Sequence, residues 1–149
     1  MYGKTLKGRF RPKNPQKYRG DVTNIIFRSS WELKFLNFAD GHPSILEYSS
    51  EEIVIPYVSP VDNRWHRYFP DFIIKKKDVN NQVSSVLIEI KPKAQTIEPV
   101  RKTKISKTYL NEVFTWGVNT AKWEAARKYC KKKGWTFEIL TEKELNIKW

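Results

Sequence analysis

The sequence predicts one domain of the α/β class, with α+β character, in which helices flank a central mixed sheet. Two patterns lead to this prediction: runs of alternating apolar residues that are typical of strands, and two segments with apolar residues at helical spacing. A chain of 149 residues is long enough to bury roughly 68–70% of its unfolded surface around a single core. The expected order is a helix, three antiparallel strands, a second helix and a final strand.

The first helix is expected over residues 30–39. Ser29 can cap its amino end, and Glu32 follows three residues later, in the position of a capping box. Asp-Gly-His-Pro at residues 40–43 ends the helical pattern. Its aromatic side chains recur at helical spacing and should pack as a stripe on the sheet: Trp31, Phe35 and Phe38.

Strands are expected over residues 52–58, 68–75, 84–91 and 136–140. Residues 60–63 and 78–81 have the Pro, Asp and Asn content of turns, so the first three strands should form an antiparallel meander.

The second helix is expected to begin near Asn119 or Thr120 and to end with three lysines before Gly134, which suits a left-handed carboxyl-terminal cap. Residues 93–117 are the least regular part of the sequence, with a short helix expected around residues 107–114. The sequence gives no other assignment for this stretch.

Residues 1–20 contain many basic side chains and no acid, and prolines and glycines interrupt any period, so they are expected to form a basic arm before a domain at residues 21–149. Such an arm can lie along DNA, or it can be a solvated tail that only a partner orders. The candidate DNA-binding residues here and in a second basic cluster are Lys4, Lys7, Arg9, Arg11, Lys13, Arg101, Lys102, Lys104 and Lys107.

The composition points to a polyanionic partner. There are 28 Lys and Arg residues against 16 Asp and Glu, a net charge of +12, and double-stranded DNA is the leading candidate because phosphate contacts release counterions. Cys130 is the only cysteine, so neither an intramolecular disulfide nor a thiolate zinc site can form. Neither a membrane span nor a signal peptide is expected.

Two acidic residues interrupt apolar strand segments. Asp71 lies between Pro70 and Phe72, and Glu89 precedes Ile90 and Lys91. Because alternate strand residues share a face, Glu89 and Lys91 should project together. Asp71 and Glu89 could bind Mg²⁺, or Mn²⁺ in its place, with the Ile90 carbonyl as a further ligand.

Lys91 would then hold the attacking water or a phosphate oxygen in phosphodiester hydrolysis. Each part alone has an ordinary structural explanation: a solvated strand face for the Glu-x-Lys tripeptide, a turn for Pro70 and Asp71, and a helix cap for Glu32. Their combination in a basic protein favours a nuclease.

These residues also resemble a known family. Glu32 on the first helix, Phe69-Pro70-Asp71-Phe72 and Glu89-Ile90-Lys91-Pro92 on successive strands look like the PD-(D/E)XK nuclease superfamily, particularly its TnsA-like branch. Further segments are similar to the head-completion nucleases of contractile-tailed bacteriophages, among them residues 8–15, 28–32, 49–57 and 67–72.

The resemblance implies a restriction-endonuclease-like core and Mg²⁺-dependent cleavage of DNA. It places Glu32 at the metal, directly or through water, and a polar or basic residue on the following helix, which Lys122 or Asn119 could supply. For Asn119, a position on the exposed surface of the helix is favoured over a role at the site. It also implies action on packaged DNA before tail attachment, in the host cytoplasm during assembly or at the head–tail junction of the virion, with head or neck proteins as partners and a homodimer as one possible form. The alternative is a non-catalytic DNA-binding protein of the phage head or neck that inherited the nuclease fold.

Overall fold

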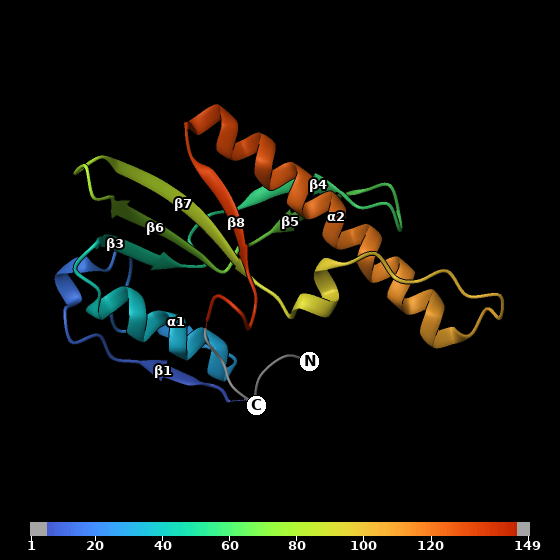
Figure 1. Cartoon of the computed structure of the whole chain (residues 1–149), viewed down its shortest axis with the longest axis horizontal. Coiled ribbons are helices and arrows are strands. Elements are labelled where there is room, and N and C mark those ends of the chain that lie inside the picture. The colour runs from blue at the N-terminus through green and yellow to red at the C-terminus, as the bar shows by residue number, and fades with distance from the viewer. Residues whose placement is uncertain (1–5, 146–149) are drawn as a thin grey trace.

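A four-stranded mixed sheet forms the centre of the computed structural model, which describes residues 6–145. Its strand order is β3 (Ile45–Ser50), β6 (Phe72–Lys77), β7 (Val83–Ile90) and β8 (Thr136–Leu140). The first three strands pair antiparallel, whereas β8 runs parallel to β7. The predicted fold class, with a mixed sheet between helices, is confirmed (Figure 1).

Helices cover both faces of this sheet (Figure 1). α1 (Ser30–Gly41) packs on one face, where its side chains join alternate residues of β7, including Ile88 and Ile90, in the larger core. α2 (Lys107–Lys133) packs on the other face with Leu87 in a second core. In the described part of the chain, neither helix has a stretch apolar enough to cross a membrane.

The first helix forms as its cap predicts. The Ser29 hydroxyl oxygen accepts a hydrogen bond from the Glu32 amide at 3.1 Å. Trp31 and Phe35 are buried against the sheet, but Phe38 is 48% exposed. The predicted aromatic stripe is therefore wrong at Phe38, which lies at the edge of the buried face.

The predicted turns at residues 60–63 and 78–81 both join antiparallel strands, but the first hairpin does not continue into the central sheet as the predicted meander requires. β4 (Ile55–Val58) pairs with β5 (Trp65–Tyr68) in a separate hairpin, and β6 pairs instead with β3, a strand that the sequence pattern did not predict. The expected strand over residues 68–75 is divided because Phe69, Pro70 and Asp71 separate β5 from β6, and Pro70 has no amide hydrogen for a sheet ladder. The expected strands that became β7 and β8 are confirmed.

α2 is one helix of 27 residues rather than two shorter ones. Ser106 is its cap, accepting a hydrogen bond from the Tyr109 amide at 3.0 Å, so the predicted start at Asn119 or Thr120 is wrong. The helix continues through Gly117, the last residue of the stretch with the least regular sequence pattern. The predicted end is confirmed, with Gly134 in the left-handed conformation at φ 73°. A 3₁₀ helix (Lys93–Thr96) lies in the stretch before α2.

The amino-terminal residues are part of the folded domain. β1 (Gly8–Phe10) pairs antiparallel with β2 (Ile25–Phe27), a 3₁₀ helix covers Pro15–Lys17, and Phe10 and Tyr18 are buried in the larger core. The expectation of a separate arm therefore needs correction for residues 8–19. The reason is that its interspersed aromatic side chains have apolar surface to bury.

A buried carboxylate fixes this segment to the end of α1. Asp40 accepts hydrogen bonds from the amides of Lys13 and Asn14 and from the Tyr48 hydroxyl, at 3.0, 3.2 and 3.0 Å. The Lys17 ammonium donates to the Ala39 carbonyl at 2.7 Å, close to the carboxyl end of the helix, where positive charge is favourable.

Candidate active site

Asp71 and Glu89 come together at the junction between the hairpin and the central sheet. Asp71 immediately precedes β6, and Glu89 is the penultimate residue of β7, the neighbouring strand. The Asp71 carboxylate accepts a hydrogen bond from the Ile90 amide at 2.7 Å. This bond fixes Asp71 beside the Glu-Ile-Lys tripeptide.

The strand geometry predicted for that tripeptide is confirmed. Ile90 is fully buried in the core under α1, whereas the Glu89 carboxylate and the Lys91 ammonium lie together, 3.7 Å apart. Glu89 is only 5% exposed, so its carboxyl group lies in a poorly solvated environment.

The Glu89 carboxylate disfavours ionisation of its neighbour Asp71. Burial raises the pKa of Asp71 well above its ordinary value, and the nearby Glu89 carboxylate raises it further. Burial also raises the pKa of Glu89, although the Lys91 ammonium opposes that shift. A cation between the carboxylates would therefore be strongly stabilised.

Glu32 approaches this pair from α1. It is buried, and its carboxylate accepts a hydrogen bond from the Ser29 hydroxyl at 3.3 Å. Burial raises the pKa of Glu32, and its charge in turn raises the pKa of Asp71. Glu32 is therefore both part of the helix cap and an electrostatic neighbour of the acidic pair.

Lys122 reaches the site from α2. Its ammonium lies 5.6 Å from the centre of the Tyr68 ring, and the pKa of Lys122 is lowered by burial and by the charge of Lys91. The Glu89 and Asp71 carboxylates oppose this shift. Lys122 thus faces the predicted site, whereas Asn119 is only 6% exposed, which corrects the expectation that Asn119 lies on the exposed helix surface.

Two further residues at the site were not among the sequence candidates. Tyr68 is buried beside Glu89. Burial is the main cause of the raised pKa of the Tyr68 hydroxyl, and the charge of Glu89 is the next. Arg28 pairs with Glu51 at 2.5 Å and lies close enough for Glu32 and Asp71 to raise its pKa. In the sequence, Tyr68 and Arg28 are marked only by lying within a few positions of Asp71 and Glu32. Their neighbours lie equally close, so this pattern could not have identified them.

The residues present fit a hard divalent cation bound by few protein ligands. Within residues 6–145, no group of three or more His, Cys, Asp or Glu side chains is arranged to hold a metal ion. Mg²⁺ keeps several of its waters and commonly binds proteins through one or two carboxylates, which Asp71 and Glu89 can provide. The Tyr68 hydroxyl is buried next to them, and it and Glu89 lie close enough for each to shift the pKa of the other.

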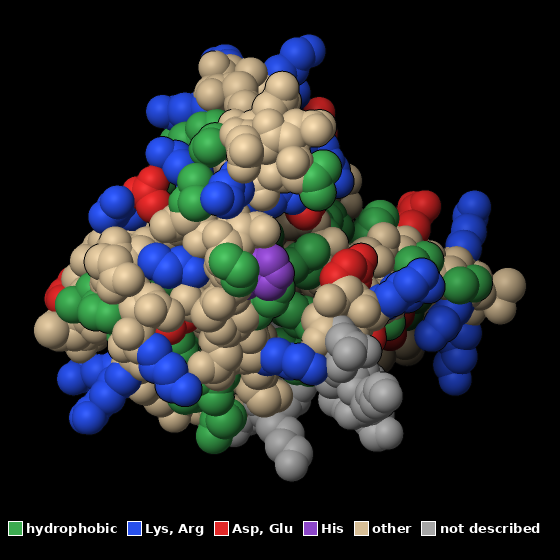
Figure 2. Space-filling model, turned by 60° about the vertical axis from the view of Figure 1, so that its left-hand side comes forward, with side chains coloured by type: hydrophobic (Ala, Val, Ile, Leu, Met, Phe, Trp, Pro, Cys, Tyr) green, Lys and Arg blue, Asp and Glu red, His purple; other side chains and the backbone are tan. Residues whose placement is uncertain are grey.

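The candidate DNA-binding residues do not form one surface. Lys7, Arg9, Arg11 and Lys13 are exposed on the segment around β1, and the cluster from Arg101 to Lys107 is exposed before and at the start of α2. Figure 1 shows these two segments far apart along the long axis, and Figure 2 shows Lys and Arg side chains spread over the visible face. Lys4 lies outside the described residues.

Comparisons with known proteins agree with this arrangement. Residues 42–142 match the model of the TnsA-like endonuclease N-terminal family, a range that contains Asp71, Glu89, Lys91 and Lys122. The chain is also 44% identical over 139 residues to the head completion nuclease of Enterobacteria phage T4, covering 91% of this chain and 90% of that protein. The chain is therefore a nuclease of the TnsA-like endonuclease family, related over nearly its whole length to a phage head completion nuclease.

Proposed function

We propose that the protein is a Mg²⁺-dependent endonuclease that hydrolyses phosphodiester bonds in double-stranded DNA, with Mn²⁺ as a substitute metal. The observation that carries the proposal is the pair of half-buried Asp71 and buried Glu89, with Lys91 3.7 Å from the Glu89 carboxylate. Such a pair is costly for the fold unless a cation or a proton neutralises it. In a protein of net charge +12, a DNA phosphate is a suitable substrate.

Asp71 and Glu89 would hold the metal, with the Ile90 carbonyl as a further ligand and Glu32 as an accessory ligand, directly or through water. When bound, Mg²⁺ supplies charge neutralisation at the phosphate and a lowered pKa for a bound water. The hydrogen bond from the Ile90 amide to Oδ2 of Asp71 fixes the direction of this carboxylate.

The two lysines would act on the phosphate and the water. The Lys91 ammonium, held beside Glu89, would orient the attacking water or bind a non-bridging phosphate oxygen. Lys122 would stabilise the negative charge that develops on the phosphate, since burial makes such a contact stronger than it would be in water. Lys91 immediately follows β7 and Lys122 lies on α2, and both elements pack into the cores.

We further propose that the chain acts in phage head completion. The support is the 44% identity to a protein of that name. In this role it would act on packaged DNA before tail attachment, in the host during assembly or at the head–tail junction, in contact with head or neck proteins. A homodimer would place two active sites on the two DNA strands.

The cleavage proposal is tested by nicking of a supercoiled plasmid. Wild type should nick the plasmid with Mg²⁺ and lose this activity in EDTA. Asp71→Ala and Lys91→Ala should lower the rate by at least about 100-fold, and Glu98→Ala, an exposed control, should cut normally. If pure wild type does not nick, or Asp71→Ala nicks equally well, the protein is not this enzyme, and a non-catalytic DNA-binding role takes its place.

A further inference from the structure

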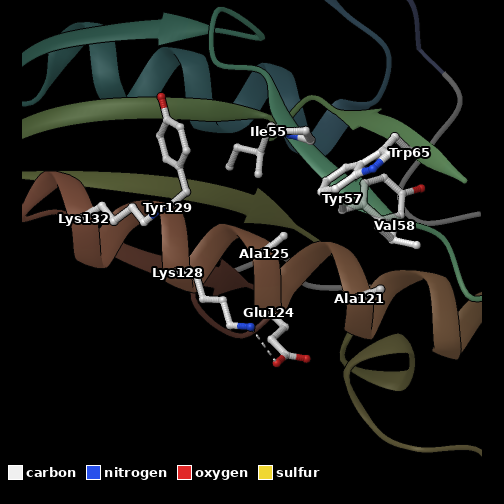
Figure 3. A pocket seen from close by; sticks show the side chains of 11 residues that line it. Ile55, Tyr57, Val58, Trp65, Ala121, Glu124, Ala125, Lys128, Tyr129 and Lys132 are labelled. Carbon is white, nitrogen blue, oxygen red and sulfur yellow. Dashed lines mark ion pairs between the residues drawn. The ribbon is translucent and has the colours of Figure 1, made fainter.

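A second recessed surface adjoins the candidate site. It is a cavity of about 490 Å³ between the β4–β5 hairpin and α2, a size typical of ligand-binding clefts, which are about 300–1,000 Å³. Figure 3 shows Tyr57, Val58 and Trp65 gathered at its hairpin end, with Tyr129 and Lys132 farther along the helix. We call this surface the hairpin groove.

Trp65 is the most unusual residue of the hairpin groove. It is 73% exposed, although tryptophan is highly buried on average in folded proteins. It pairs across the hairpin with Val58, which is also exposed. The pair with Val58 stabilises the hairpin but leaves most of the Trp65 ring exposed, and this free surface suits stacking against a planar ligand.

The charge of the hairpin groove favours an anionic ligand. Two lysines, Lys128 and Lys132, line it together with a single acid, Glu124, which lies 3.5 Å from Lys128. Aromatic rings beside ammonium groups are the combination by which proteins hold nucleic-acid single strands, because rings stack on bases while cations contact the backbone.

The hairpin groove adjoins the active site through Tyr57. Tyr57 lines the groove, and the Lys122 ammonium lies 5.9 Å from its ring and 5.6 Å from that of Tyr68. Tyr68 in turn is buried beside Glu89. Lys122 does not itself line the groove, but the contact of Tyr57 with Lys122 places the groove next to the acidic pair.

We infer that the hairpin groove binds an unpaired segment of DNA, with a base stacked on Trp65, and directs it to the Asp71 and Glu89 site. The inference rests on the proposed function in that DNA is the substrate. An unpaired segment is the fitting occupant because the bases of a duplex stack on one another and cannot offer a face to Trp65. It extends the substrate class from plain duplex to DNA with a single-stranded end, gap or flap.

The test compares binding of a fluorescent oligothymidylate and of a blunt duplex by fluorescence anisotropy in EDTA. Trp65→Val removes stacking but keeps a residue that favours strands. It should weaken oligothymidylate binding at least about fivefold and change duplex binding less than about twofold. Trp65→Phe should retain most of the affinity. Phe38→Ala, another exposed aromatic residue, on α1, should leave both affinities unchanged.

Equal oligothymidylate binding by Trp65→Val and wild type would overturn the inference, as would a parallel loss of both DNA forms. A groove used by an acidic protein would give the first of these results. Because EDTA prevents cleavage, binding is measured independently of catalysis. If wild type failed to nick plasmid but Trp65→Val weakened oligothymidylate binding, the cleavage proposal would fail and the groove inference would stand.

Discussion

At Asp71, the ionised carboxylate that the proposed chemistry needs also destabilises the metal-free protein. Burial and the Glu89 carboxylate raise its pKa. The folded state therefore binds a proton more tightly than the unfolded state does. The protonated form is compatible with folding, and the stability of the metal-free protein should fall as pH rises from the ordinary aspartate pKa through the raised one.

Asp71→Asn should therefore stabilise the metal-free protein at neutral pH, on the order of 1–3 kcal/mol. The asparagine oxygen can still accept the hydrogen bond from the Ile90 amide, while the buried negative charge is removed. Urea unfolding in EDTA at several pH values measures the effect. The gain should shrink below pH ~4, where the unfolded carboxyl is also protonated. A variant less stable than wild type at neutral pH would contradict the account.

The sequence predicted the parts of the candidate site that depend on local geometry, but not those that depend on tertiary contacts. The period of a strand is local, so the placement of Glu89 and Lys91 on one side followed from their spacing. The contact of Tyr68 with Glu89 depends on how the β4–β5 hairpin folds against α2, which no local pattern encodes. The same holds for the hydrogen bond from the Ile90 amide to Asp71, which joins the end of β7 to a residue just before β6.

At the scale of elements, α2 shows a local signal that packing overrides. Two helices were expected in this stretch, one around residues 107–114 and one from Asn119 or Thr120, yet the helix is continuous through Gly117. Thr120 donates its hydroxyl hydrogen to the Trp116 carbonyl within the helix, at 2.7 Å, and Trp123 packs into the second core. Tertiary contacts outweigh the intrinsic cost of one glycine, roughly 1 kcal/mol.

Gly117→Ala should stabilise the protein by about 0.5–1 kcal/mol. An added Cβ would meet only the Pro60 side chain, at 3.6 Å, which is an ordinary van der Waals distance. Chemical denaturation measures the change, and Thr115→Ala, at an exposed position in the same helix, serves as the comparison. Destabilisation by Gly117→Ala would mean that the helix does not continue through this residue.

The amino-terminal segment is a second case in which composition was misleading. Its basic residues suggested an arm, but Asp40 and the buried aromatic side chains make it part of the domain. The deciding partner of Lys13 and Asn14 is Asp40, 26 or 27 positions away in the sequence. Only the tertiary structure brings these residues together.

Asp40→Ala should cost about 3 kcal/mol of folding stability, because it leaves buried donors without an acceptor. Limited trypsin digestion should then cut first near Lys13, Lys17 and Arg19, whereas wild type resists cleavage there. Glu98→Ala, at an exposed loop position, should match wild type. Equal protease resistance of Asp40→Ala and wild type would show that the carboxylate does not hold the segment.

At the scale of the whole molecule, the charge excess should dominate affinity for duplex DNA. Basic side chains are spread over the surface (Figure 2), and each phosphate contact contributes about −0.9 to the slope of log affinity against log salt concentration. Because residues 8–19 contribute to the core, deleting the amino-terminal segment would damage the fold. Point substitution of exposed basic residues is therefore the appropriate test, instead of deletion.

The double variant Arg9→Ala, Arg11→Ala should weaken duplex binding and reduce the magnitude of the salt slope by up to about 2. The double variant Lys102→Ala, Lys104→Ala, in the second basic cluster, should have the same effect on affinity and on the slope. Anisotropy titrations over a range of NaCl concentrations measure the slopes. Lys76→Ala combined with Lys77→Ala, on the far end of β6 from Asp71, should leave the slope unchanged. A pair whose removal leaves the slope unchanged does not contact phosphate.

The predicted fold class survives at this scale although several elements were misassigned. The order of helix, antiparallel strands, helix and final strand is confirmed around β7, whose apolar residues face both cores. β3 was not predicted, and residues 65–68 were not recognised as the partner strand of β4, because short strands of mixed polarity have weak alternation. The structure nevertheless brings the candidate acids Asp71 and Glu89 together, because they lie on or beside the strands that the sequence predicts best.

Calorimetric titration of the protein with Mn²⁺ tests the central claim most directly, because it measures the metal site without requiring a substrate. Wild type should bind Mn²⁺, and both Asp71→Asn and Glu89→Gln should weaken binding at least about tenfold, or about 1.4 kcal/mol. Glu98→Gln, at an exposed position, should bind like wild type. Equal binding by wild type, Asp71→Asn and Glu89→Gln would contradict a metal site at the buried acidic pair.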